Sequence, residues 1–155
     1  VGQYLDDWFG ITLPFTTAGV VVAQTFVAMP FLVITVEAAL RQLDPRLEEA
    51  SRTLGASRWY TFRRVTLPAI RPALVAGAVL AWARALGEFG ATITFAGNFP
   101  GTTQTMPLAV YLSLETNPEE AIVLALVMIA ISFGVLLSLR DRWFGAANRP
   151  MQVAA

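Results

Sequence analysis

The chain is 155 residues long, 55% of them hydrophobic and only 14% charged, a composition typical of membrane proteins and not of soluble domains. Its eleven basic residues are all arginines and are balanced by eleven acidic residues, which excludes a polybasic nucleic-acid-binding protein. Because the chain has no Lys, Cys or His, it lacks the ATP-binding phosphate loop, disulfides, thiolate and imidazole metal sites and a Ser/His/Asp triad. We therefore expect no catalytic residues, no metal and no cofactor.

Three runs with little or no charge approach the roughly 20 apolar residues that a helix needs to cross a bilayer. They predict an all-α membrane protein, a transmembrane helical bundle, with spans at about 18–36, 67–90 and 121–139. The apolar stretch 89–97 is too short to span alone, and we expect it to extend the second helix. The stretch 106–114 is also too short, and we expect a short or re-entrant segment there.

The arginines set the expected topology, since cytoplasmic loops retain basic residues and translocated loops are depleted of them. Residues 1–40 and 85–139 contain no Arg, whereas 41–71 contains seven. We therefore expect a cytoplasmic loop at 41–66, an external loop at 98–119, an external N-terminus and a cytoplasmic C-terminal tail. An odd number of spans that starts outside, with no initiator Met, leads us to expect that further spans precede this sequence.

The 41–66 loop is predicted to hold two short helices. Asp44 can cap a helix whose first residue is Pro45, Gly55 can end that helix in the left-handed conformation, and Ser57 can cap a second helix. The second helix carries three aromatic residues, Trp59, Tyr60 and Phe62. Aromatic side chains among arginines are typical both of a docking surface for a partner protein and of a helix at the lipid headgroups, so both interpretations stay open.

A longer spacing pattern runs through this loop. Glu49, Ala50 and Ser51 are followed after three residues by Gly55, and nine residues later comes Val65-Thr66-Leu67-Pro68. The pattern resembles the E-A-A, three residues, Gly, nine residues, I-x-L-P signature of the permease subunits of ATP-binding-cassette importers, with Ser51 for Ala and Val65 for Ile. The resemblance implies that the loop couples the membrane spans to a separate nucleotide-binding ATPase subunit, and that this chain is not an enzyme. It assigns the coupling to Glu49, Ala50, Ser51, Gly55, Leu67 and Pro68.

Arg84 and Glu88 lie one helical turn apart in the second span and can pair with each other. An unpaired Arg near the middle of a membrane costs about 2.5–3.5 kcal/mol, so Arg84 needs a partner or a polar cavity. Two interpretations follow. The guanidinium either attracts an anion near a translocation pathway or belongs to a purely structural pair.

The stretch from Arg84 to Thr92, together with Ala96-Gly97-Asn98 and the segment 103–111, resembles the molybdate branch of the oxyanion importers. Sulfate permeases share a related pattern, usually with Tyr in place of Phe89. The resemblance implies that residues 1–155 are a single transmembrane permease domain in the inner (cytoplasmic) membrane, surrounded by lipid. It further implies a homodimeric pathway that receives molybdate or tungstate from an external substrate-binding protein. Its candidate pathway residues are Arg84, Glu88 and Asn98.

Other functions fit the sequence less well. A membrane-embedded hydrolase would need two neighbouring carboxylates, but Glu37 and Glu88 are expected near opposite membrane boundaries. A secondary transporter would show repeated halves, and the sequence has no internal repeat. A permease for sulfate or another oxyanion shares the same coupling loop and remains the main alternative.

Overall fold

The computed structural model describes the backbone of residues 12–147 and the side chains of residues 12–138. Every regular element in this part of the chain is helical, which confirms the predicted all-α fold class. Three stretches are long and apolar enough to cross a membrane, namely Thr17–Gln42, Arg58–Leu86 and Pro118–Ser138. The described residues up to Thr103 form one compact unit and those from Gln104 onward form a second, and each unit is described by itself.

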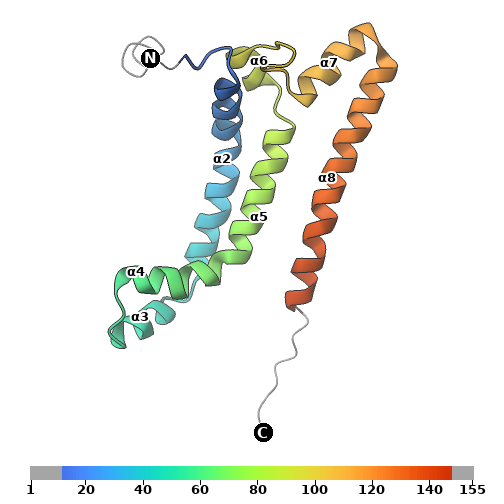
Figure 1. Cartoon of the computed structure of the whole chain (residues 1–155). Coiled ribbons are helices and arrows are strands. Elements are labelled where there is room, and N and C mark those ends of the chain that lie inside the picture. The colour runs from blue at the N-terminus through green and yellow to red at the C-terminus, as the bar shows by residue number, and fades with distance from the viewer. Residues whose placement is uncertain (1–11, 148–155) are drawn as a thin grey trace. The chain divides into compact units, whose positions relative to one another are not determined.

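The two longest helices of the first unit lie side by side, α2 (Thr17–Gln42) and α5 (Leu67–Leu86) (Figure 1). Membrane helices approach closely where one of them carries small residues. Gly77 of α5 is buried, and a Cβ atom there would lie 3.0 Å from Leu32 Cδ1 and 3.1 Å from Thr35 Cβ of α2. The missing side chain at Gly77 therefore allows the short distance between the two helices.

Three short helical segments join α2 to α5: α3 (Pro45–Thr53), α4 (Arg58–Thr61) and the π-helical turn η1 (Phe62–Thr66). We call residues 44–66 the elbow. Figure 1 shows α4 and η1 crossing the end of α2 before the chain turns upward into α5. The predicted pair of short helices is thus present, and η1 leads from the second of them directly into the membrane-length helix.

The helical structure is interrupted between α5 and the next helix, α6 (Gly90–Ala96). The α6 helix packs against α2. The expected extension of the second span through 89–97 is therefore wrong. Gly87 follows the last residue of α5, and its N–H donates to the Ala83 carbonyl at 3.3 Å. Glycines at positions 87 and 90 disfavour a continuous helix here, because glycine has a low helix propensity.

The loop after α6 returns to the beginning of α2 and closes this end of the first unit. The Thr17 hydroxyl donates to the Thr102 carbonyl at 3.0 Å. The rings of Phe15 and Phe99 meet edge to face with their centroids 6.1 Å apart. These contacts hold α6 and the following loop against the first turn of α2.

The second unit is a helical hairpin of α7 (Met106–Thr116) and α8 (Pro118–Ala147). Asn117 forms the junction, since its N–H donates to the Ser113 carbonyl at 2.7 Å and its carbonyl accepts from Ala121 N–H at 3.2 Å. The α7 helix has 11 residues. It corresponds to the short segment expected at 106–114, and a helix of that length rises about 16 Å, roughly half the hydrocarbon core.

The predicted spans 18–36, 67–90 and 121–139 overlap the three membrane-length stretches, although α2 continues to Gln42 and α5 ends at Leu86. The expected external N-terminus includes residues 1–11 and the expected cytoplasmic tail includes 148–155, which lie outside the described residues. The assignment of residues 1–155 to one transmembrane domain stays a prediction.

Candidate functional site

The elbow forms where the sequence predicts it, through the same local interactions. The Asp44 carboxylate accepts the Arg46 N–H at 3.0 Å and caps α3, whose first residue is Pro45. Gly55 follows α3 with φ +81°, the left-handed conformation that glycine adopts without steric cost. The Ser57 hydroxyl then accepts the Tyr60 N–H at 3.2 Å and caps α4. Both predicted caps and the glycine turn are confirmed.

Two side-chain hydrogen bonds hold α3 against the segment that leads into α5. Ser51 Oγ and Thr61 Oγ1 are 2.9 Å apart, and the Thr66 hydroxyl donates to Glu48 Oε1 at 2.8 Å. Thr61 and Thr66 are 3% and 4% exposed, so water does not compete freely for their hydroxyl groups. The two short helices of the elbow are therefore fixed to each other and to the end of η1.

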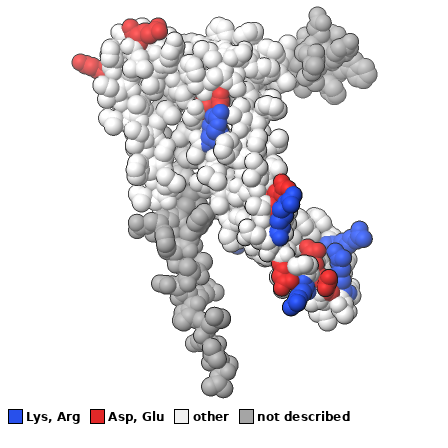
Figure 2. All heavy atoms as spheres, turned by 180° about the vertical axis from the view of Figure 1, so that it is seen from behind, with Lys and Arg blue, Asp and Glu red and all other residues white. Residues whose placement is uncertain are grey.

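The outer side of the elbow exposes large apolar side chains. Leu54 beside the glycine turn is 89% exposed, and Trp59 on α4 is 68% exposed. Trp59 also stacks on Phe62, with ring centroids 5.8 Å apart. Between residues 44 and 66 the chain carries five arginines and three acidic residues, and Figure 2 shows that most of the visible charged side chains of the first unit lie at or near the end formed by α3 and α4. This surface combines apolar contact area with charge.

A shallow hollow of about 450 Å³ lies beside the glycine turn, within the exposed side of the elbow. A Cβ atom built on Gly55 would meet no atom within 4 Å, so the turn itself borders open space. The hollow is lined by Ser51, Leu54, Gly55, Ala56, Ser57 and Tyr60. A protruding side chain of another protein has room to enter it.

The predicted coupling residues lie on α3, in the glycine turn and in the first turn of α5. Glu49 and Ala50 are exposed on α3, and Ser51 faces Thr61. Leu67 and Pro68 form the first turn of α5. The sequence pattern did not identify the residues that fix the elbow internally, namely Glu48, Thr61 and Thr66.

One signal for these missed residues was present, because Glu48 and Ser51 are three apart on α3 and share a face. Their partners could not be found in the same way. Thr61 and Thr66 are five residues apart, and in an α-helix this spacing places side chains about 140° apart.

A second cluster lies where α5 ends. Arg84 Nη1 is 2.6 Å from Glu88 Oε2, which confirms the predicted pairing. The other carboxylate oxygen, Glu88 Oε1, accepts the Ala91 N–H in the first turn of α6 at 2.7 Å. The Glu88 side chain is 5% exposed, whereas that of Arg84 is 37% exposed. Glu88 is thus fully engaged in holding the α5–α6 junction, and Arg84 keeps part of its guanidinium accessible.

Asn98 does not join this pair. It follows Gly97 at the opposite end of α6, a seven-residue helix that rises about 10 Å. Its Oδ1 atom is buried and makes no hydrogen bond within the described part of the chain. The structure therefore brings together two of the three predicted pathway residues.

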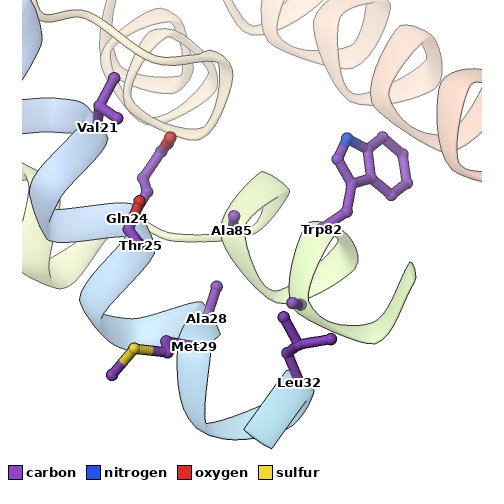
Figure 3. Close-up of a pocket in the computed structure, with 9 residues that line it drawn as sticks. Val21, Gln24, Thr25, Ala28, Met29, Leu32, Trp82 and Ala85 are labelled. Carbon is purple, nitrogen blue, oxygen red and sulfur yellow. The ribbon is translucent and has the colours of Figure 1, made fainter. Parts of the chain in front are cut away.

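A groove of about 330 Å³ runs between α2 and α5 (Figure 3). Its α5 side is formed by Trp82 and by two small residues, Ala81 and Ala85. Gln24 and Thr25 of α2 provide its polar groups. The remaining lining residues are Val21, Ala28, Met29 and Leu32.

Comparison with known proteins gives consistent matches. Residues 4–149 match the family described as "Binding-protein-dependent transport system inner membrane component". The chain is 43% identical over 149 residues to the molybdenum transport system permease protein ModB of Escherichia coli (strain K12), and 46% identical over 142 residues to that of Mycobacterium tuberculosis. It is also 41% identical over 143 residues to the sulfate transport system permease protein CysT of Escherichia coli (strain K12).

These alignments cover most of this chain but only part of each relative. They include 96%, 92% and 90% of the chain, and 65%, 53% and 52% of the three relatives, respectively. The chain therefore spans between about half and two thirds of the length of the curated relatives it matches. The family match and the three membrane-length helices together give it a multi-pass location in the inner membrane.

Proposed function

This chain belongs to the family of binding-protein-dependent transport system inner membrane components, and on that premise we propose that it forms part of the permease of an ATP-driven molybdate importer. In this proposal the chain lines the membrane pathway together with a second permease copy. A separate nucleotide-binding subunit hydrolyses ATP on the cytoplasmic side. A substrate-binding protein delivers the anion from outside.

The observation that carries the proposal is the elbow. The signature residues from Glu49 to Thr66 lie in this compact structure beyond the ends of α2 and α5, and Leu54 and Trp59 are exposed on its outer side. Exposed apolar groups next to charged ones are typical of a protein interface. The elbow is also joined without a break to α5 through η1, so a partner that moves it also moves a membrane-length helix.

We favour a protein partner over lipid headgroups as the occupant of this surface. The exposed face of α3 carries Glu49, which makes no side-chain hydrogen bond among the described residues, and the next residue is a small one, Ala50. An exposed carboxylate faces repulsion from anionic lipid, whereas it can pair with an Arg of a partner protein. The hollow beside Gly55 offers that partner a place to insert a side chain.

Molybdate is the proposed substrate because the two molybdenum permeases compared above are 43% and 46% identical to this chain, slightly above the sulfate permease at 41%. Phe89 agrees with this choice, since sulfate permeases usually carry Tyr at the matching position. Tungstate resembles molybdate in size and charge and is expected to share the pathway. Sulfate remains the second candidate, supported by the same comparison.

We assign different roles to the three pathway candidates. The partly exposed guanidinium of Arg84 can attract an oxyanion, while its bond to Glu88 prevents the positive charge from holding that anion too tightly. Glu88 fixes Arg84 and the start of α6. Asn98 offers an amide at the far end of α6.

The test is ATP hydrolysis by the native transporter that contains this chain, reconstituted in lipid vesicles with its ATPase subunit and binding protein. We expect the binding protein loaded with molybdate or tungstate to stimulate hydrolysis several-fold, and the sulfate-loaded or empty protein to have little effect. Stimulation by sulfate alone would move the assignment to a sulfate permease. Failure of the ATPase subunit to co-purify with the chain would contradict the proposed function as a whole.

A further inference from the structure

Two side-chain hydrogen bonds join α3 to the segment formed by α4 and η1. Their side chains lie on one face of α3 and on the facing side of that segment. On α3, Glu48 and Ser51 are three residues apart and therefore lie on the same side. Their partners, Thr66 and Thr61, are five apart and would point in different directions on a regular α-helix. The π-helical turn η1 changes this, since its bonds join residue i to i+5, as from the Phe62 carbonyl to Leu67 N–H. The extra residue in this turn brings both threonines to the face that meets α3.

Among the described residues, these two bonds are the side-chain hydrogen bonds that join α3 to α4 and η1, and the glycine turn is the covalent connection. Gly55 adopts φ +81° and borders open space, so no neighbouring side chain holds the turn at this position. The hydrogen bond between Glu48 and Thr66 joins the first half of α3 to the residue directly before α5. Arg52 lies 3.4 Å from the other Glu48 oxygen and steadies the carboxylate from the same helix.

We propose that Glu48 is a positioning residue, which transmits movement of α3 to α5 through its hydrogen bond with Thr66 across the π turn. The inference rests on the proposed function, because it presumes that an ATPase subunit moves the elbow. The proposal separates contact with the partner from transmission of its movement, two roles that the sequence pattern assigns to the same residues. Exposed groups such as Leu54 contact the partner, and the buried side of the elbow carries the movement into the membrane.

The experiment uses paired variants in the native transporter. Glu48→Leu and Thr66→Val each remove one end of the bond, and we expect each to reduce stimulation of ATP hydrolysis by the loaded binding protein by about 5-fold or more. Glu48→Gln keeps an oxygen acceptor and Thr66→Ser keeps a hydroxyl donor, so both are expected to retain stimulation. The Glu48→Leu/Thr66→Val double variant should be no worse than the poorer single variant, because both changes remove the same contact.

Thr53→Val is the matched control. Thr53 lies on the same helix, and its hydroxyl bonds only the Glu49 carbonyl of its own helix turn, so we expect unchanged stimulation. Unstimulated hydrolysis, its KM for ATP and co-purification of the ATPase subunit should stay at wild-type values in all variants. A merely structural role for Glu48 would lower the yield of assembled complex instead.

The outcomes distinguish the two proposals. A wild-type transporter without any stimulation would contradict the proposed function. A stimulated wild type together with fully stimulated Glu48→Leu and Thr66→Val variants would overturn the positioning role alone. The positioning role would also be overturned if the two single effects multiplied in the double variant, or if Thr66→Ser lost stimulation as completely as Thr66→Val.

Discussion

Gly55 shows how much of the elbow depends on one backbone conformation. Its φ of +81° belongs to the left-handed region, where a Cβ atom meets the neighbouring carbonyl oxygen. The space around it is open, since a Cβ atom at this position would have no other atom within 4 Å. Any effect of a substitution on the free energy of the turn therefore comes from backbone strain and not from steric contact with other residues.

This separation allows a sharp test. We expect Gly55→Val to abolish most molybdate uptake, because a β-branched residue in this conformation costs at least about 1–2 kcal/mol and shifts the turn population roughly tenfold. Gly55→Asn should keep most of the uptake, since Asn tolerates the left-handed region. The measurement is molybdate accumulation by cells that carry each variant, with membrane insertion checked in parallel. Equal uptake by the two variants would show that the turn conformation is not required.

The junction between α5 and α6 depends on one carboxylate with two partners. Glu88 binds Arg84 within α5 and the Ala91 N–H of α6, and it is almost fully buried. Removal of one member of a buried ion pair leaves the other charge without compensation, and this costs more than the intact pair contributes. The helix break at Gly87 and the orientation of Arg84 are thus linked through the same side chain.

We expect Glu88→Ala to lower the free energy of unfolding by about 1–3 kcal/mol, because the Ala91 N–H loses its acceptor and the partly exposed Arg84 loses its partner. Glu37→Ala is the matched control, because Glu37 and Arg41 form the same type of pair at 2.7 Å with side chains 54% and 78% exposed. That change should cost less than about 0.5 kcal/mol. Thermal unfolding of the detergent-purified transporter compares the stability losses of the two variants. Equal stability losses in the two variants would contradict a special role for the buried pair.

The elements of the fold were predictable to different degrees. Long apolar runs predicted the three membrane-length helices, since lipid requires length and hydrophobicity that few other structures need. Asp44, Gly55 and Ser57 predicted the elbow correctly, because caps and left-handed turns depend on local interactions.

The remaining features depend on contacts that a single segment does not encode. The π turn η1 shows no signal of its own in the sequence, and it acts only because it aligns Thr61 and Thr66 with α3. The end of α5 at Leu86 was missed because hydrophobicity continues beyond it. The interruption comes from Gly87 and from the Glu88 side chain, which supplies an acceptor to the next helix.

At the scale of the whole molecule, the first unit has two ends with different character. One end is the charged elbow with exposed apolar side chains, and the other is closed by α6 and its loop against α2. The arginine distribution predicts that the elbow faces the cytoplasm. In the proposed importer, ATP-driven movement enters at the elbow and passes along α5 toward the end where Arg84 and Glu88 lie.

Site-directed photo-crosslinking tests most directly whether an ATPase subunit binds the elbow. A photoreactive amino acid can replace Leu54 in the native transporter. Position 26 of α2 is the control, since Phe26 is also highly exposed, at 75% against 89% for Leu54, but lies within a membrane-length helix. We predict adducts with the ATPase subunit from position 54 and none from position 26. An active transporter in which position 54 gives no ATPase adduct would contradict the claim.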